Sequence, residues 1–237
     1  MRRGLQIFMT ILMLMAIYCT FKYRVLPSSV INIEKKHTIV IDPGHGGVDP
    51  GKVGVDGSLE KDINLNISMK IKKILIDNGY EVVLTRDEDI GLYKESDSNK
   101  KSADMKARCK VIEEAEADLV ISIHQNSFEQ ESVRGAQVFY YENSPEGKKL
   151  AECIQNGVRE LADATNDRSV KANSSYYMLL HTPCPTVIVE CGFMSNSNEA
   201  KLLGTDEYQE KLALAVCKGI EDYFGEEDVN KASEGHR

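Results

Sequence analysis

The stretch Thr38-Ile-Val-Ile-Asp-Pro-Gly-His-Gly-Gly47 decides the fold, because an apolar run passes there into a histidine held between glycines. Successive β-branched residues that end in Pro43 and Gly44 are typical of a buried strand that runs into a loop. The glycines leave little side-chain bulk beside His45, so its imidazole can face a ligand. His45 is therefore the first candidate for chemistry. An isolated loop histidine can also be a turn residue whose ring bonds to nearby backbone.

Apolar runs alternate with amphipathic stretches along the rest of the chain, which predicts an α/β fold. Strands are expected at residues 38–41, 81–85, 119–123, 136–141, 176–180 and 186–189. Helices are expected at residues 61–76, 101–117, 145–162 and 207–224, the last with Thr205 or Asp206 as its N-cap. Strands that alternate with helices indicate one domain built on a mostly parallel sheet that is covered on both faces.

The N-terminus carries a membrane insertion signal. Residues 4–21 are almost unbroken apolar sequence, with Arg2 and Arg3 before them and Lys22 and Arg24 after them. As a helix this run would span about 27 Å at ~1.5 Å per residue, close to the ~30 Å hydrocarbon core of a bilayer. No small-x-small cleavage site follows. We therefore expect an uncleaved signal anchor rather than a removed signal peptide.

This signal sets the expected organisation and location of the chain. The signal anchor or transmembrane segment covers residues 1–24, a linker covers 25–36, and the catalytic domain covers 37–224. Residues 225–237 are polar and are predicted to form a disordered tail. The catalytic domain is then extracytoplasmic, either anchored to the membrane or secreted.

Charge and cysteine content restrict the possible partners and cross-links. The formal net charge is −8, and setting aside the N-terminal segment leaves 25 basic against 37 acidic residues. Nucleic acid is an unsuitable partner, because phosphate neutralisation needs clustered Lys and Arg. Cys184 and Cys191 flank an expected strand and would lie about 20 Å apart, beyond the ~7 Å Cα limit for a disulfide. Buried free thiols are expected instead.

Three of the predicted strands are followed by residues that are costly to bury, namely His45, His124 and Glu190. In open α/β sheets, ligands bind in the crevice outside the carboxyl ends of the strands. Glu60 follows the loop 48–58 and opens a helix, so it belongs to the same edge. We therefore expect these four side chains to meet in one crevice.

Two histidines and two carboxylates in one crevice suit a catalytic zinc ion, which takes three protein ligands and leaves a position for water. His45, Glu60 and His124 would be the ligands, and Glu190 would be the general base. Simpler roles exist for each residue. Glu60 could complement the helix dipole, and His124 could be a hydrogen-bonded core histidine. Glu190 is harder to explain in this way, since a carboxylate after an apolar run needs a cation or hydrogen-bond donors.

Other motifs argue against competing chemistries. There is no GxSxG elbow, which excludes the usual serine hydrolase arrangement, and Gly44-His-Gly-Gly47 lacks the Lys and Ser/Thr of a phosphate loop. Arg86 and Arg108 are expected to make structural ion pairs that hold the loops around the crevice. Contact with an anionic substrate is the alternative for these two arginines.

Five ordered motifs resemble those of zinc-dependent N-acetylmuramoyl-L-alanine amidases of the amidase-3 type. They are Ile41-Asp-Pro-Gly-His-Gly-Gly47, Leu59-Glu-Lys61, Leu84-Thr-Arg86, Ser122-Ile-His-Gln-Asn126 and Val189-Glu-Cys-Gly-Phe-Met-Ser-Asn196. The resemblance covers residues 38–224. It implies a six-stranded mixed sheet flanked by helices, one Zn²⁺ ion, and hydrolysis of the amide between N-acetylmuramic acid and L-alanine in peptidoglycan. It assigns His45, Glu60 and His124 as zinc ligands and Glu190 as the catalytic glutamate.

A bare catalytic domain behind a signal anchor is most similar, within the family, to the germination-specific amidases of the spore cortex. This similarity implies a role in muramic-δ-lactam formation in the cortex space of a forming spore, with an accessory protein that shares in placing the enzyme on its substrate. The alternatives are a vegetative autolysin or division amidase, a zinc peptidase that cuts the stem peptide, and a non-catalytic peptidoglycan-binding module. Only a short loop follows His124, so there is no room there for the blocking helix of some division amidases.

Overall fold

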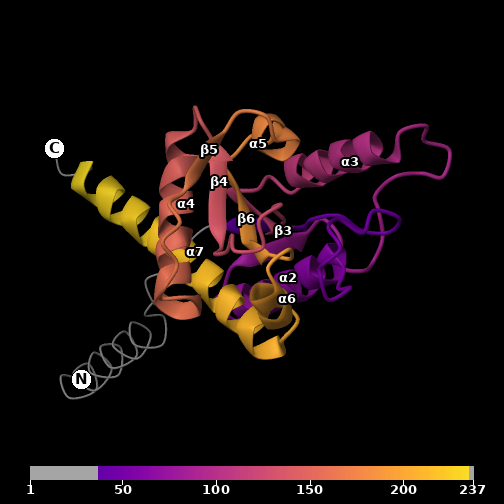
Figure 1. Cartoon of the computed structure of the whole chain (residues 1–237). Helices are drawn as coiled ribbons and strands as arrows, with labels where there is room; N and C mark the ends of the chain where they lie inside the picture. Colours follow the sequence, from indigo (N-terminus) through magenta and orange to yellow (C-terminus); the bar gives the residue numbers. More distant parts are fainter. Residues whose placement is uncertain (1–36, 235–237) are drawn as a thin grey trace, which may run out of the picture. The chain divides into compact units, whose positions relative to one another are not determined.

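The computed structural model describes residues 37–234, with side chains as far as Glu226, and contains one six-stranded mixed sheet (Figure 1). Its strands are β1 Thr38–Pro43, β2 Glu81–Leu84, β3 Leu119–Asn126, β4 Gln137–Tyr141, β5 Lys171–Asn173 and β6 Thr186–Phe193. The strand order is β2-β1-β3-β6-β4-β5. β1, β2, β3 and β6 run parallel, whereas β4 is antiparallel to β6 and parallel to β5. The expected α/β architecture is confirmed.

The helices that cover the sheet are α2 Glu60–Asp77, α3 Lys100–Glu114, α4 Pro145–Gly157, α5 Tyr177–His181, α6 Ser197–Leu203 and α7 Asp206–Glu234. A single π-helical turn, η1 Val158–Ala162, continues α4. Thr205 caps α7, because its hydroxyl oxygen accepts the backbone N–H of Tyr208 at 3.3 Å. Four of these helices begin within one residue of the start predicted from the sequence.

One face of the sheet, which we call the closed face, is covered by α2, α4, α6 and α7. Its core is apolar and includes Ile39 and Ile121 of the sheet, Ile67 of α2 and Ile154 of α4. α4 and α7 lie side by side (Figure 1). Their backbones touch, since a Cβ added at Gly219 would lie 2.5 Å from the Cα of Ile154. The closed face therefore holds the larger part of the hydrophobic core.

The opposite face, which we call the open face, is covered by α3 and the short helix α5. Val40 and Val120 pack there against Ile112 of α3 and Met178 of α5. Successive side chains of a strand alternate between the two faces. Residues Asp42, Ser122, His124 and Glu190 therefore project on the open face, because each lies an even number of residues along its strand from Val40, Val120 or Ile188. The polar residues of the strands share this face.

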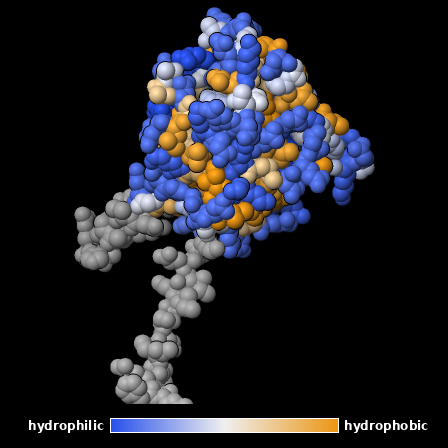
Figure 2. All heavy atoms as spheres, turned by 90° about the horizontal axis from the view of Figure 1, so that it is seen from below, coloured by the Kyte–Doolittle hydropathy of each residue, from blue (hydrophilic) through white to orange (hydrophobic). Residues whose placement is uncertain are grey.

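The surface of the described residues mixes polar and apolar side chains. Figure 2 shows apolar side chains lying between polar ones when the molecule is seen from below. The more exposed apolar residues come from several elements and include Val48, Val53, Phe128 and Leu202. Single exposed apolar residues are normal on protein surfaces.

Two predicted elements differ from the structure. The strand predicted at residues 176–180 is wrong, because these residues form α5, and the sixth strand is β5 instead. A short apolar run does not distinguish a strand from a helix. The side-chain oxygen of Asn173 accepts the backbone N–H groups of Ser175 and Tyr176, each at 2.8 Å, and this turn leads into the helix.

The prediction of a disordered tail is wrong for residues 225–234, because α7 continues through them to Glu234. Extending a helix that is already packed costs less than starting a new one, and acidic residues, Lys and Ala are compatible with helix. Helix α6 was not predicted either; the side-chain oxygen of its N-cap Asn196 accepts the backbone N–H of Glu199 at 3.0 Å. Polar composition alone was not a sufficient reason to predict disorder.

The predicted signal anchor lies outside the described residues. Within residues 37–234, no helix is both long and apolar enough to cross a membrane. Five cysteines lie in the described part of the chain, and all of them are free thiols. The prediction of buried free thiols is confirmed for Cys153, Cys191 and Cys217, whereas Cys109 and Cys184 are only partly buried.

Candidate functional site

A cleft of about 590 Å³ lies at the carboxyl ends of β1, β3 and β6, on the open face of the sheet. All four predicted site residues line it: His45, Glu60, His124 and Glu190. The cleft is completed by side chains from α3 and from the segment around α5, including Met105 and Tyr176. The sheet edge predicted from the sequence is the edge at which the structure places these residues.

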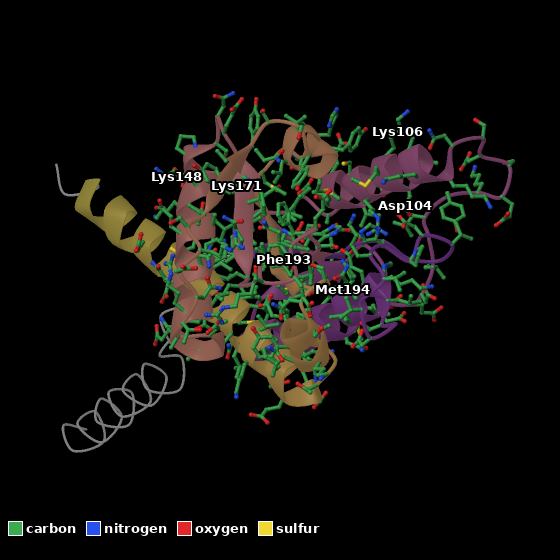
Figure 3. The ribbon with its side chains drawn as sticks, in the orientation of Figure 1. Asp104, Lys106, Lys148, Lys171, Phe193 and Met194 are labelled. Atoms are coloured by element: carbon green, nitrogen blue, oxygen red, sulfur yellow. The ribbon has the colours of Figure 1, made fainter. Side chains whose placement is uncertain are left out.

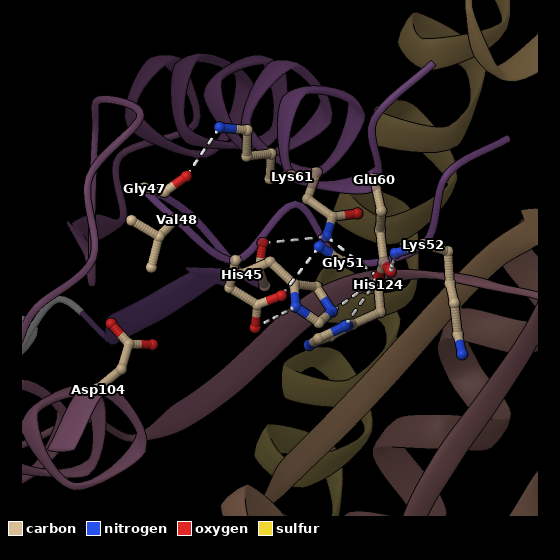
Figure 4. A network of polar contacts seen from close by, with 12 residues as sticks. His45, Gly47, Val48, Gly51, Lys52, Glu60, Lys61, Asp104 and His124 are labelled. Atoms are coloured by element: carbon tan, nitrogen blue, oxygen red, sulfur yellow. Dashed lines mark hydrogen bonds and ion pairs between the residues drawn. The ribbon is translucent and has the colours of Figure 1, made fainter. Parts of the chain in front are cut away.

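Three of the four residues converge on one point, as Figure 4 shows. Oε1 of Glu60 lies 3.1 Å from Nδ1 of His124 and 3.3 Å from Nε2 of His45. One ligand atom from each residue lies within 4.8 Å of the others, so His45, Glu60 and His124 could hold a metal ion. Bonds of ~2.0–2.1 Å to a tetrahedral zinc ion place neighbouring ligand atoms about 3.3 Å apart. The distances to Glu60 fit that geometry.

Backbone and side-chain hydrogen-bond donors of the protein itself hold the Glu60 carboxylate in place. Glu60 is the first residue of α2, and its Oε2 accepts the backbone N–H of Lys52 at 2.7 Å. Its Oε1 accepts the backbone N–H of Gln125 at 3.0 Å and lies 3.4 Å from the side-chain nitrogen of Asn64. Burial acts to raise the pKa of Glu60, but hydrogen bonds from His124 and His45 lower it overall. Glu60 is therefore an ionised and oriented carboxylate.

His45 is held at both its ring and its backbone. Nδ1 lies 2.9 Å from the carboxylate of Asp49, which leaves Nε2 directed at Glu60. Such a contact to the second ring nitrogen fixes the orientation of a metal-binding histidine. Burial lowers the pKa of His45, but the carboxylates of Glu60 and Asp49 raise it overall. His45 also has φ 62°, a left-handed conformation that is uncommon outside glycine.

The glycines after His45 allow another loop to lie against it. A Cβ added at Gly46 would lie 2.3 Å from the carbonyl oxygen of Ile90, and one at Gly47 would lie 2.8 Å from the backbone nitrogen of Gly91. Ile90 and Gly91 belong to the loop between β2 and α3. The close approach of this loop therefore requires glycine at positions 46 and 47, and so do the positive φ angles of both residues.

Glu190 differs from the three converging residues. It lies on β6 directly beside His124 in the parallel register of β3 and β6. Its Oε2 is buried and has no hydrogen-bond partner among the described residues. Burial raises the pKa of Glu190, the negative charge of Glu60 raises it further, and His124 opposes the rise. A carboxylate in this position can accept a proton and release it again.

The two arginines of the site behave differently from each other. Arg108 makes the predicted ion pairs, with Asp42 at 2.7 Å and with Asp104 at 2.6 Å. Arg86 donates only to backbone carbonyl oxygens among the described residues. Figure 3 shows Asp104 on the side of α3 that faces the sheet, with Lys106 on the other side of that helix. Both arginines hold loops, but the predicted ion pair is confirmed only for Arg108 among the described residues.

Sequence reasoning missed several residues that position or complete the site. Asp49 and Asn64 contact His45 and Glu60, but nothing in their spacing marks them before the loop and α2 are built. Tyr176 was assigned to a strand, whereas its ring lies 5.6 Å from that of Phe139 and lines the cleft. For Asp49, the signal in the sequence was its position shortly after the Asp-Pro-Gly-His-Gly-Gly run.

Comparison with known proteins gives consistent matches over this domain. The profile of the N-acetylmuramoyl-L-alanine amidase family matches residues 39–222. The germination-specific N-acetylmuramoyl-L-alanine amidase of Bacillus subtilis is 39% identical over 79% of this chain and 80% of its own length. The CwlD amidase of Clostridioides difficile, solved in complex with the GerS lipoprotein, is 41% identical with a TM-score of 0.78, covering 80% of this chain and 99% of that one. The amidase AmiC2 of Nostoc punctiforme is 33% identical with a TM-score of 0.70, covering 80% and 97% respectively.

Proposed function

The chain belongs to the N-acetylmuramoyl-L-alanine amidase family, and from this premise we propose that His45, Glu60 and His124 bind a zinc ion and that Glu190 is the catalytic base. The enzyme hydrolyses the amide bond between N-acetylmuramic acid and L-alanine in peptidoglycan. The observation that carries the proposed site is the convergence of two imidazole nitrogens on Oε1 of Glu60, at 3.1 and 3.3 Å.

The donor set fits zinc better than a harder cation. Zn²⁺ prefers imidazole nitrogen with carboxylate oxygen and binds three protein ligands in catalytic sites. Mg²⁺ and Ca²⁺ prefer sites made mainly of oxygen ligands. When bound, zinc would supply Lewis-acid polarisation of the substrate carbonyl and would lower the pKa of water.

Glu190 would carry the proton transfers. What supports this role is its place beside His124 on the neighbouring strand and the unpartnered Oε2 atom. The carboxylate takes a proton from the attacking water and then donates it to the leaving nitrogen of L-alanine. A raised pKa suits this dual role, because a catalytic group works best when its pKa lies near the operating pH. The same group therefore serves first as base and then as acid.

The substrate in the cell is proposed to be spore peptidoglycan. This proposal rests on the similarity to the germination-specific amidase of Bacillus subtilis and to the CwlD amidase. Muramic-δ-lactam formation in the cortex would then follow removal of the stem peptide. In the structure, residues 127–136 between β3 and β4 contain no helix, which favours this role over that of a division amidase with a blocking helix. A vegetative autolysin is the second candidate.

An accessory protein and a membrane anchor complete the proposal. The structure of the CwlD amidase contains the GerS lipoprotein, which supports a protein partner for this chain as well. The apolar run at residues 4–21 supports anchoring at the outer surface of a membrane. Both features would keep the enzyme near its substrate.

The experiment that tests the proposed function combines metal analysis with product identification. The purified protein is expected to contain one zinc ion per chain and to release stem peptides with free L-alanine amino ends from spore peptidoglycan. Fragments cut within the stem peptide would identify a peptidase instead. Binding without any product would identify a peptidoglycan-binding module. Hydrolysis that persists in the metal-free protein would contradict the zinc assignment.

A further inference from the structure

We propose that Arg108, assisted by Arg86, sets the metal affinity of the site by holding the backbone of His45 in its left-handed conformation. The proposal rests on the proposed function, because it assumes that His45 is a metal ligand. Arg108 is a positioning residue here, since its guanidinium bonds the backbone carbonyl oxygen of His45 and its side chain is buried.

The two arginines share the three carbonyl groups that follow one another at the end of β1. Arg86 donates Nε to the carbonyl oxygen of Pro43 and Nη2 to that of Gly44, each at 3.0 Å. Arg108 donates Nη1 to Pro43 at 2.7 Å and Nη2 to His45 at 2.5 Å. A buried carbonyl that has left the sheet needs another donor. The two guanidinium groups supply these donors.

Both guanidinium groups are buried, and burying a cation is costly unless it is paired. Arg86 is 2% exposed and Arg108 is 1% exposed. Asp42 is 1% exposed and accepts Nη1 of Arg108 at 2.7 Å, while Asp104 accepts its Nε at 2.6 Å. The carboxylate of Asp42 is satisfied in turn by hydroxyl groups of Ser122 and Thr85, each at 2.6 Å. The guanidinium of Arg108 is therefore fixed from two sides.

This arrangement acts on His45 in particular. His45 has φ 62°, where the backbone of a residue with a side chain is strained. The strain persists only if surrounding contacts hold the peptide, and the contact to its carbonyl oxygen comes from Arg108. A peptide that relaxed here would turn the imidazole away from Glu60. The partly exposed carboxylate of Asp49 contacts the imidazole ring of His45, whereas Arg108 contacts its carbonyl oxygen.

The variant Arg108→Lys distinguishes a role in holding the His45 backbone from a role in charge pairing alone. Lys would keep a positive charge beside Asp42, but it lacks the fork that reaches the Asp42 carboxylate and the carbonyl oxygen of His45 together. Arg159 provides a matched control. Its guanidinium also holds a loop through backbone carbonyl oxygens, those of Asn166 and Arg168, and neither it nor those residues line the cleft.

The test measures zinc affinity of the purified full chain by competition with a chromophoric chelator. Arg108→Lys is expected to weaken zinc binding ten- to hundredfold, the usual effect of losing a group that orients a ligand. Arg159→Lys is expected to stay within about twofold of the unaltered chain. Thermal unfolding of each metal-free protein shows whether the two changes perturb the fold to similar extents. Unaltered zinc affinity in Arg108→Lys would overturn the proposal, and so would an equal loss in Arg159→Lys.

Two further variants keep the test decisive if Arg108→Lys does not fold. Asp104→Asn leaves the pair between Arg108 and Asp42 in place, and Arg86→Lys leaves Arg108 unchanged; each is expected to weaken zinc binding several-fold. Normal zinc affinity in both would also overturn the proposal. The readout does not depend on amide hydrolysis. Tight zinc binding without peptidoglycan cleavage would therefore contradict the proposed function alone.

Discussion

The closed and open faces of the sheet are built from the same strands but contain different chemistry. On the closed face, side chains such as Ile39, Ile121 and Val189 meet an apolar layer from α2, α4 and α7. On the open face, the alternate positions of those strands include Asp42, His124 and Glu190. The closed face therefore contributes mainly apolar burial to stability, whereas the open face carries the polar side chains of the cleft. We expect substitutions on the two faces to have separable effects.

The largest effect is expected from Glu190→Gln on the open face. The amide keeps the shape of the side chain but cannot take up the proton, so the rate of hydrolysis should fall by about a thousandfold. Zinc content and thermal stability should stay near those of the unaltered protein. The rate is measured by release of stem peptide from peptidoglycan. Normal turnover in this variant would rule out Glu190 as the base.

The second effect tests the closed face. Ile67 is fully buried on α2, and Ile67→Ala should lower the free energy of unfolding by about 3 kcal/mol through lost burial and the cavity left behind. Denaturant unfolding of the metal-free protein measures the loss. Zinc affinity at a temperature where the variant remains folded should be unaltered. A matching loss of zinc affinity would mean that the two faces are not separable.

The third effect concerns the buried pair of Asp42 and Arg108. Burial acts to raise the pKa of Asp42, but Arg108 and the hydroxyl groups around it prevail and lower it from 3.8 to about 2. A lowered pKa in the folded state contributes stability that is present above pH 3.8 and is lost as the pH falls towards 2. The contribution is about 2 kcal/mol.

Asp42→Asn should remove this part of the acid dependence. Unfolding of the metal-free variant should depend less steeply on pH between 4 and 2 than unfolding of the unaltered protein. Asp206 is a suitable control, because its side chain is 91% exposed and pairs with Lys70. Asp206→Asn should leave the slope unchanged. An equal slope in Asp42→Asn would show that Arg108 does not hold the Asp42 carboxylate ionised.

The smallest effect is expected at the cleft wall. Tyr176 is partly exposed beside the cleft and rests on Phe139, so its ring can contact substrate without holding the fold together. Tyr176→Ala should raise KM several-fold at nearly constant kcat, whereas Tyr176→Phe should behave much like the unaltered enzyme. Steady-state kinetics on soluble muropeptides measure both constants. A fall in kcat without a change in KM would place Tyr176 in the chemical step instead.

Much of the open face could be predicted because strand ends mark it in the sequence. Apolar runs before His45, His124 and Glu190 predicted both the strands and their shared edge. The sequence could not reveal that Asn173 starts a turn into α5, because a run of five apolar and aromatic residues is compatible with helix and strand alike. The polar strand β5 has no apolar pattern at all, and its pairing with β4 exists only in the assembled sheet.

The residues that position the proposed ligands were less predictable than the proposed ligands themselves. Asp49 acts through a loop that folds back on His45, and Arg108 reaches the carbonyl of His45 from α3, far along the chain. Both contacts depend on tertiary packing rather than on local spacing. The sequence predicted that Arg108 would pair with carboxylates, but it did not predict that Arg108 would contact the carbonyl oxygen of His45.

The strand order also separates the proposed metal ligands from Glu190 along the chain. His45, Glu60 and His124 all precede β6, and β6 takes its place in the sheet between β3 and β4. Contacts between residues so distant in sequence form slowly, because the intervening chain must first be closed into a loop. A chain in which β6 has not yet paired would therefore hold the three proposed metal ligands without Glu190 beside His124. The proposed base would then be the last part of the site to reach its position, and metal binding would precede competence for hydrolysis.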